Sequence, residues 1–423
     1  MWNNITAILH IHSIGNMGVL KKTQAYSNLR KAVLGELVNV KRGMSLSGEY
    51  YATEGNLIRL TLGNFQEEGG FKINTSKDDL YFTGPVREEF VLKEGDIITP
   101  LTEQVVGLLG ATARIPESDK YIQSGDVALI KCISNEIDDG YCYYLVSSDL
   151  VRRQLSAAAQ QTKIRHTSPE KIMDCEVFIP EVKDQRKIAK LLDSINKKIE
   201  LNEKINDNLD AQSQALLTET VTKTQTTRTS LGDIVDFIDG DRGKNYPTFD
   251  EFSDTGYCLF LNASNVTSTG FNFDSCQFVT KEKDESLRKG HLSRGDIVLT
   301  SRGTLGNVAF YNDSIPFDNV RINSGMLIIR PKNNRYSPIF LFVLLKSVYM
   351  KAAIESLKSG SAQPQLPIKD LQMAQFEIPS SDCGLSQLSD KLSRIDNYYS
   401  ENCLEIISLK SMSSLILSEL SSR

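Results

Sequence analysis

The chain has 423 residues, of which 40% are hydrophobic, and a formal net charge of −5 at pH 7. This length predicts two or three folded domains, and no apolar run approaches the roughly 18 residues that cross a bilayer. Seven cysteines without a CxxC pair argue against a secreted disulfide framework, so we expect a cytoplasmic protein without a membrane segment. The acidic balance counts against nucleic-acid binding without excluding it, because a local basic surface is sufficient to face phosphate.

Residues 1–30 have no counterpart elsewhere in the chain and are expected to form an N-terminal extension. From there on the sequence repeats once. Leu34-Gly35-Glu36 is matched by Leu231-Gly232-Asp233, and Ser124-Gly125 is matched by Ser324-Gly325. The matched segments stay in order at separations of 196 to 200 residues, which chance matches would not do. Each copy is therefore a whole domain followed by an appendage, not a solenoid unit of about 20 to 50 residues.

The first copy opens with a predicted domain over residues 31–180. Short β-branched and aromatic runs bounded by Gly, Asn and Asp predict strands at Asn56–Leu62, Asp96–Thr99 and Val127–Cys132. One helix is expected late in the domain, at about Tyr143–Ala159. The mixture predicts an α+β domain.

A long helix is predicted over residues 181–220, because apolar residues recur at three- and four-residue spacing. Its seam contains Ile188, Leu192, Ile195, Ile199, Asn202, Leu209 and Leu216. Residues 221–230 are rich in threonine and lack apolar periodicity, so they are expected to form a linker.

The second copy repeats this order, with a domain over residues 231–380 and a helix over 381–423. Strands are predicted at Leu259–Asn262, Asp296–Thr300 and Met326–Arg330, and a helix at Pro338–Leu357. The seam of the second long helix contains Leu385, Leu388, Leu392, Ile395, Tyr399, Asn402, Ile406, Leu409, Ile416 and Leu420.

The two seams correspond, as in the pairs Ile195 and Ile395 or Asn202 and Asn402. Either helix alone is most simply a core helix of a bundle. As a matched pair, they favour an intramolecular coiled coil in which one polar Asn in each seam fixes the register. The expected fold is two similar α+β domains separated by two long helices, with a pseudo-two-fold repeat.

Motifs that carry catalytic chemistry are missing from the sequence. It contains no GxxxxGK[ST] phosphate loop and no GxSxG nucleophile elbow. No cysteine or acidic cluster joins His10 and His12 into a metal site, and His166 and His291 stand alone. We therefore expect no catalytic residue, no metal site and no cofactor in this chain.

Several ordered segments together resemble the specificity subunit of type I restriction-modification systems. They are the two LGE/LGD openings, the segment GSAQPQLPIKDLQ at Gly360–Gln372, an Ile-Pro dipeptide and the helix that follows it. VLTSRGTLGNVAFY at Val298–Tyr311 is similar to a common segment of the target recognition domains in that family, and Ile98–Glu117 is its looser counterpart. The resemblance covers about residues 31–423.

The resemblance implies that each domain is a target recognition domain reading one half of a split double-stranded DNA target. The long helices would be antiparallel spacers on which two methyltransferase (modification) subunits dock, and two restriction (translocase and nuclease) subunits can join them. S-adenosylmethionine, ATP and Mg²⁺ would be bound by those partners, so DNA methylation and cleavage would belong to them. Because the copies have diverged in their loops, we expect an asymmetric target.

Base readers are expected among Arg, Lys, Asn and Gln side chains, whose donor patterns match guanine and adenine edges. Loop stretches beside glycines carry such residues in both copies. For any one of them a solvated side chain is the simpler interpretation, but we expect several to touch DNA. The predicted DNA-binding residues are Lys41, Arg42, Gln104, Lys163, Arg165, Arg242, Lys244, Asn262, Asn265, Arg302, Thr304, Gln363 and Gln365. The predicted spacer and partner-docking residues are Ile188, Leu192, Ile195, Ile199, Leu388, Leu392, Ile395 and Tyr399.

Three other functions remain open at this point. A coiled-coil adaptor that does not bind DNA would explain the acidic charge, but not the divergence of the polar loops. A specificity subunit of a methylation-only or type IIB-like system has the same sequence features. A self-sufficient enzyme is disfavoured, because no catalytic constellation is found.

Overall fold

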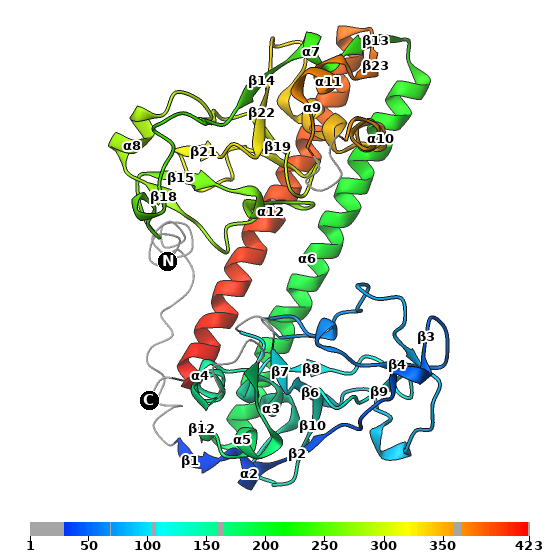
Figure 1. Cartoon of the computed structure of the whole chain (residues 1–423), viewed down its shortest axis with the longest axis vertical. Coiled ribbons are helices and arrows are strands. Elements are labelled where there is room, and N and C mark those ends of the chain that lie inside the picture. Colours follow the sequence, from blue (N-terminus) through cyan, green and yellow to red (C-terminus); the bar gives the residue numbers. More distant parts are fainter. Residues whose placement is uncertain (1–28, 68, 104–106, 159–164, 359–364, 422–423) are drawn as a thin grey trace. The chain divides into compact units, whose positions relative to one another are not determined.

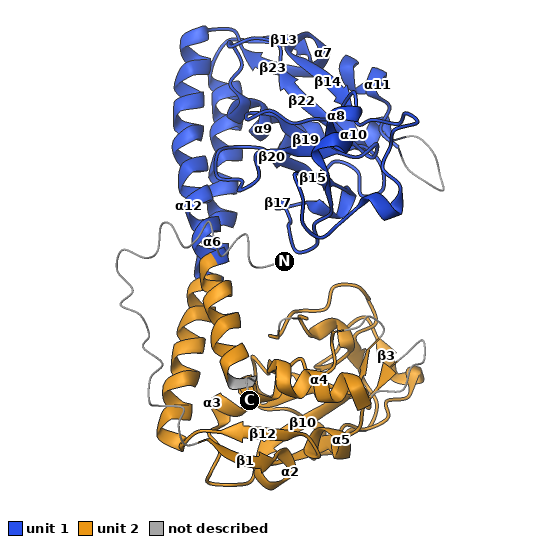
Figure 2. Cartoon of the chain, turned by 90° about the vertical axis from the view of Figure 1, so that its left-hand side faces the viewer, with its two compact units in different colours: residues 1–17, 200–407 blue, residues 18–199, 408–423 orange. Residues whose placement is uncertain are grey.

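The computed structural model describes residues 29–67, 69–103, 107–158, 165–358 and 365–421 (Figure 1). The chain divides into two compact units (Figure 2). The first-domain unit comprises residues 18–199 and 408–423, and the second-domain unit comprises residues 1–17 and 200–407. Each unit contains one α+β domain and parts of two long helices. Among the described residues, no helix is both long and apolar enough to cross a membrane.

The main sheet of the first domain is antiparallel and follows the order β2–β10–β6–β8. Its strands are β2 (Val38–Arg42), β10 (Val127–Cys132), β6 (Ile97–Pro100) and β8 (Ala113–Arg114). A second sheet has the order β3–β5–β4–β9, in which β4 and β9 are parallel. Its strands are β3 (Tyr51–Ala52), β5 (Tyr81–Phe82), β4 (Leu57–Arg59) and β9 (Tyr121–Ile122). Two further pairs join β1 (Arg30–Val33) to β12 (Glu176–Ile179) and β7 (Thr102–Glu103) to β11 (Arg165–His166).

The second domain repeats this plan. Its main sheet has the order β14–β22–β19–β20, from β14 (Val235–Asp239), β22 (Met326–Pro331), β19 (Ile297–Thr300) and β20 (Val308–Phe310). A second sheet has the order β18–β15–β21, from β18 (Phe278–Val279), β15 (Cys258–Leu261) and β21 (Val320–Ile322), again with one parallel pair. Two further pairs join β13 (Thr226–Ser230) to β23 (Gln375–Pro379) and β16 (Val266–Thr267) to β17 (Gly270–Phe271).

Short helices fill the connections of both domains. In the first domain they are α2 (Leu34–Leu37), α5 (Pro169–Met173) and the 3-10 turns η2 (Gly48–Tyr50), η3 (Leu62–Asn64) and η4 (Glu88–Phe90). In the second domain they are α7 (Leu231–Ile234), α8 (Lys281–Ser286), α11 (Ile368–Met373), η5 (Phe249–Glu251) and η6 (Ala263–Asn265).

The single late helix expected in each domain is a pair of helices, so that prediction was wrong. The pairs are α3 (Asp139–Val146) with α4 (Asp149–Ala158), and α9 (Pro338–Lys346) with α10 (Val348–Leu357). Serines cause the breaks. Ser347 has extended backbone and its hydroxyl accepts the Met350 N–H, which caps the second helix. The matched Ser147 donates its hydroxyl to the carbonyls of Tyr143 and Tyr144.

The long helices are α6 (Val182–Lys223), of 42 residues, and α12 (Asp382–Ser421), of 40 residues. In the second-domain unit they run antiparallel, since Asn202 bonds Glu405 while Leu217 shares a core with Leu385. In the first-domain unit, Ile416 packs against the core that contains Leu192. The predicted antiparallel pairing is confirmed.

The segment 221–230, expected to be a linker, is instead the end of α6 and strand β13. The β13 ladder pairs Thr227 with Ile378, and the Thr227 hydroxyl lies 2.7 Å from that of Ser380. Threonine is β-branched and fits a strand, and this strand exposes polar side chains, so apolar periodicity was the wrong criterion. The second domain therefore begins at Thr226.

Candidate nucleic-acid interface

Two of the predicted DNA-binding stretches come together in each domain. In the first, β7 pairs with β11, which places Glu103 opposite Arg165. In the second, Arg302 forms a backbone bridge with Gln365, and the next N–H along the chain, that of Leu366, donates to the Ser301 carbonyl at 3.0 Å. Both domains therefore hold the segment after a central strand against the segment before α5 or α11.

Glu103 anchors this contact in the first domain. Its side chain is 1% exposed and forms an ion pair with Arg165 at 2.8 Å. Its Oε2 also accepts the backbone N–H groups of Gly107, Leu108 and Leu109 at 2.8 to 3.0 Å. Arg165 donates in addition to the carbonyl and hydroxyl of Ser156. The Arg165 guanidinium therefore bonds groups of its own domain, and we assign Arg165 the role of positioning this loop.

In the second domain Arg302 occupies the backbone position of Thr102, because the N–H that follows each paired residue donates to the preceding carbonyl, Leu101 in the first domain and Ser301 in the second. Arg302 is half-buried, and its guanidinium forms no hydrogen bond or ion pair with any residue that the structure describes. The loop is closed without it: the Thr300 hydroxyl bonds the Thr304 carbonyl and accepts the Asn307 N–H at 2.9 Å. Thr304 is exposed beside Gly303, whose φ of 73° requires glycine. Among the described residues, the hydrogen bonds that close the loop thus leave the Arg302 guanidinium unused.

Residues 241–245 follow β14 in the second domain and carry Arg242 and Lys244 beside the buried Asp241; we call this segment the basic loop. Asp241 is 5% exposed and accepts the N–H groups of Gly243 and Arg288, each at 2.7 Å. The Gly243 N–H, followed by the Arg288 N–H, lowers the pKa of this carboxyl. A cavity of about 300 Å³ is lined by Asp241, Gly243, Lys244, Asn245 and Arg288.

The cationic side chains around that cavity differ in whether they bond other residues of the domain. Lys244 and Arg288 are exposed, whereas the predicted Arg242 pairs with Asp239 at 2.9 Å and bonds the Ser324 carbonyl. Sequence reasoning missed Arg288. The signal was present, because Arg288-Lys289-Gly290 has the same basic-residue-plus-glycine character as the stretches that were selected.

The matched loop of the first domain carries Lys41 and Arg42. Lys41 pairs with Glu89, and its ammonium lies 4.9 Å from the centre of the Phe90 ring. Arg42 is exposed at the end of β2. A Cβ on the next residue, Gly43, would lie 2.2 Å from the Ser124 carbonyl oxygen, so only glycine permits this approach.

The side chains of Asn262 and Asn265 stabilise the turn in which they lie. Asn265 is 2% exposed; its amide donates to the carbonyls of Asn272 and Ser275, and its oxygen accepts the Asn262 N–H. Asn262 accepts the N–H of Ser264 as the cap of η6. Every hydrogen-bonding group of the Asn265 side chain is used, so we assign it a structural role. The predicted residues Gln104, Lys163 and Gln363 lie outside the described residues, and Gln365 is exposed.

Comparison with known proteins finds the same duplication. A family model described as the type I restriction modification DNA specificity domain matches residues 28–211 and again residues 226–402. The chain belongs to this family. Two matches in one chain make it a double-domain member, in agreement with the resemblance found in the sequence.

Individual members of the specificity family align over most of the chain. The MjaVIII specificity subunit of Methanocaldococcus jannaschii is 24% identical over 338 residues, covering 75% of this chain and 76% of that protein. The EcoBI specificity subunit of Escherichia coli is 22% identical over 340 residues, covering 73% and 68%. The crystal structure of a type I S subunit from M. genitalium has the same fold, with a TM-score of 0.55, 18% identity and coverage of 94% and 96%.

The long helices α6 and α12, which correspond to the spacer helices of the specificity family, bury most of the seam residues that were expected to dock partner subunits. The buried residues are Ile188, Leu192, Ile195, Leu388 and Leu392, while Ile199, Ile395 and Tyr399 are half-buried. Tyr399 also donates its hydroxyl to the Thr269 carbonyl at 3.1 Å. Ile188 and Leu192 belong to the core of the first-domain unit, and Leu388 and Leu392 belong to that of the second-domain unit, so a docking partner would meet other residues. In the second-domain unit the exposed apolar residues of the helices are Leu201, Tyr398, Leu404 and Ile407, and in the first-domain unit they are Leu191 and Leu415.

Proposed function

We propose that this chain is the DNA sequence-reading subunit of a type I restriction-modification complex and that its two domains read the two halves of a bipartite target. The carrying observation is the double match to the DNA specificity domain. Specificity needs side chains that reach base edges from an ordered frame. The Arg302 loop, and Lys244 of the basic loop together with the neighbouring Arg288, supply such side chains in the second domain.

The target is asymmetric in this proposal. At one matched backbone position the first domain has Thr102, and the second has Arg302, whose guanidinium bonds no described residue. A buried threonine and a half-buried arginine do not offer a base the same hydrogen-bonding groups. The two half-sites should therefore differ in sequence.

Catalysis belongs to partner subunits in this proposal, with two methyltransferase subunits and two restriction subunits in the full assembly. S-adenosylmethionine, ATP and Mg²⁺ would be bound by them, and the complex would work in the cytoplasm. Support comes from the apolar residues that the spacer helices expose, because exposed apolar side chains on a helix suit a protein partner. Leu404 and Ile407 are neighbours by their three-residue spacing on α12 and are 43% and 40% exposed.

The proposal is tested by sequencing methylated DNA from cells that carry the partner genes with and without this chain. We expect one bipartite, asymmetric methylated sequence that disappears when the chain is deleted and returns when it is restored. Methylation that persists without the chain, or a palindromic target, would contradict the proposal. Transformation with unmethylated plasmids bearing the target separates a restricting system, in which transformation falls, from a methylation-only system, in which it does not.

A further inference from the structure

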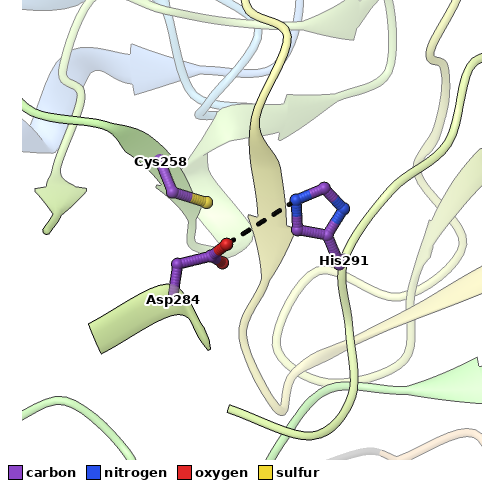
Figure 3. Close-up of side chains that lie close together, drawn as sticks. All are labelled: Cys258, Asp284 and His291. Atoms are coloured by element: carbon purple, nitrogen blue, oxygen red, sulfur yellow. Dashed lines mark ion pairs between the residues drawn. The ribbon is translucent and has the colours of Figure 1, made fainter. Parts of the chain in front are cut away.

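Three side chains of the second domain converge although they lie far apart in sequence. Cys258 comes from β15, Asp284 from α8 and His291 from the loop before β19 (Figure 3). Their ligand-type atoms, a sulfur, a carboxylate oxygen and a ring nitrogen, lie within 4.8 Å of one another. Cys258 is fully buried and Asp284 is 6% exposed, whereas 40% of the His291 side chain is exposed. One side of the cluster therefore remains open to solvent.

The first domain shows that the fold itself does not require these polar groups. In the strand register of the two parallel pairs, Leu57 stands where the second domain has Cys258. Val91 forms the isolated bridge that matches the bridge of His291. Apolar side chains fill this region in the first domain. The second domain instead buries Asp284 and Arg321 there as an ion pair at 2.7 Å, with Cys258 and His291 beside the carboxylate.

The surroundings of the cluster are those of metal ligands. His291 Nδ1 lies 3.0 Å from the Leu292 carbonyl oxygen, which only accepts, so a hydrogen bond there uses a proton on Nδ1 and leaves Nε2 as the ring nitrogen that can bind a metal. That Nε2 lies 3.8 Å from Asp284 Oδ2. The other carboxylate oxygen, Oδ1, accepts the Arg321 Nε–H at 2.7 Å. Histidine ligands that donate their second nitrogen to a carbonyl, and carboxylate ligands that are themselves hydrogen-bonded, are the usual second shell of a metal site.

We propose that Cys258, Asp284 and His291 bind one Zn²⁺ ion, with water as the fourth ligand on the open side. Sulfur, imidazole nitrogen and carboxylate oxygen in tetrahedral arrangement is a donor set that selects zinc. The Cys258 thiol loses its proton to solvent when the metal binds. Arg321 stays in place, because it bonds Oδ1 and the Asp284 carbonyl while Oδ2 takes the ion.

The ion would hold in place residues 284–291, a segment that contacts the basic loop. Arg288 lies between the ligands Asp284 and His291 in the sequence, and its N–H donates to Asp241 of the basic loop. Linking α8 to β15 and to His291 would fix both ends of residues 284–291. No reaction is assigned to the site.

The experiment uses the full chain, freed of metal with a chelator and then titrated with Zn²⁺ by calorimetry. We expect one ion per chain and a higher midpoint of thermal unfolding with zinc. Co²⁺ in place of zinc should give the near-ultraviolet sulfur-to-cobalt charge-transfer band of a thiolate ligand. Cys258→Ser should abolish that band, and Cys258→Ser and His291→Ala should each lower the zinc affinity by at least about tenfold.

Two control variants remove the same residue types elsewhere. Cys383→Ser and His166→Ala change an exposed cysteine on α12 and an exposed histidine on β11, and both should leave zinc binding unchanged. His291→Ala alters a side chain that is 40% exposed, so folding is expected to survive and is checked by its unfolding transition without metal. The proposal is overturned if the metal-free wild type binds no zinc, or if Cys258→Ser keeps the cobalt band. No DNA is present in the assay, so its failure leaves the DNA-reading function untouched.

Discussion

Asn402 of α12 donates its side-chain amide to the side-chain oxygen of Asn206 on α6 at 3.2 Å, and both residues are at most 7% exposed. Asn206 in turn donates to the Cys403 sulfur at 3.4 Å. A buried amide pair between two helices costs stability relative to apolar packing, but it satisfies its hydrogen bonds in only one register. The pair therefore sets how the spacer helices align.

The first prediction follows from this pair. Asn206→Leu should lower the free energy of unfolding by about 1–3 kcal/mol, because it leaves the buried Asn402 amide without its acceptor. Changing both residues to Leu should recover that loss, and the double-mutant cycle should show strong coupling. Urea unfolding measures each value. Asn208→Leu, at an exposed position of α6, is the control and should change little. Additive effects of the two single substitutions would contradict the assignment.

Arg302→Ala should impair recognition by the second domain without changing stability, because the guanidinium bonds no described residue. The loss should be about 1–3 kcal/mol at one position of one half-site if Arg302 reads a base. If it contacts phosphate, binding should weaken on all sequences and the salt dependence should fall by about one unit of slope. Binding titrations of the assembled complex on target variants distinguish these outcomes. Arg228→Ala, at an exposed position of β13, is the matched control. Lower thermal stability of Arg302→Ala would instead indicate a structural role.

Glu103→Ala should destabilise the first domain by about 3–5 kcal/mol, because it leaves Arg165 unpaired. It also removes the acceptor of three backbone N–H groups. Chemical unfolding measures the loss. Glu94→Ala, at an exposed position, should change stability by no more than about 0.5 kcal/mol. Equal stability of the two variants would show that the Glu103 anchor contributes nothing.

Ionisation of Asp396 should lower the stability of the second-domain unit, which is the opposite of the effect of a salt-bridged carboxylate. Burial raises the pKa of Asp396, against the opposing hydrogen bond from Asn312 at 3.2 Å and the charge of Lys346. The folded state therefore holds this proton more tightly than the unfolded chain, whose Asp pKa is about 3.9. Between that value and the raised pKa, this group's contribution to stability increases as pH falls and is lost as pH rises through the raised pKa.

Asp396→Asn should accordingly be more stable than the wild type at pH 7, since it removes a partly desolvated charge. The advantage should shrink as pH is lowered through the raised pKa of Asp396. Thermal unfolding across a pH series measures the difference. Asp390→Asn, exposed on the same helix, should show no such advantage. A variant less stable than the wild type at neutral pH would mean that the ionised carboxylate is favourable in its site.

Charged residues on the exposed apolar positions of α12 should block assembly without unfolding the chain. Leu404→Lys combined with Ile407→Lys should abolish co-elution with the methyltransferase subunit in size-exclusion chromatography, because a docked charge would be desolvated. Stability should change little, since both side chains are at least 40% exposed. Glu401→Lys on the same helix controls for charge alone. Intact assembly of the double variant would place the docking surface elsewhere.

Much of the fold was predictable because the chain repeats. The strand Val127–Cys132 was placed with its observed bounds, and the long helices followed from the spacing of residues such as Leu192 and Leu392. The register of the helices was not predictable. Sequence symmetry paired Asn202 with Asn402, whereas Asn202 bonds Glu405 and the partner of Asn402 is Asn206. An antiparallel pair aligns residues in opposite chain order, so equal positions in the two copies need not meet.

The candidate site was predictable at the level of loops but not of side chains. The stretches around Arg302 and Gln365 were selected from sequence, and the structure brings them together. Arg165 and Asn265 were selected for the same chemical reason as Arg302, yet their hydrogen-bonding groups are used internally. A polar side chain in a loop looks the same in sequence whether it faces a ligand or its own backbone. Only contacts between distant residues separate the two cases.

Both domains begin and end on paired strands: β1 lies beside β12, and β13 lies beside β23. The chain therefore enters and leaves each domain at a single place next to a spacer helix. Recombination at the two ends of residues 30–179 or 226–379 would exchange a domain while leaving the helices as they are. In the proposed complex, one such exchange would replace one half-site, and the partner subunits would act at the new target without any change of their own.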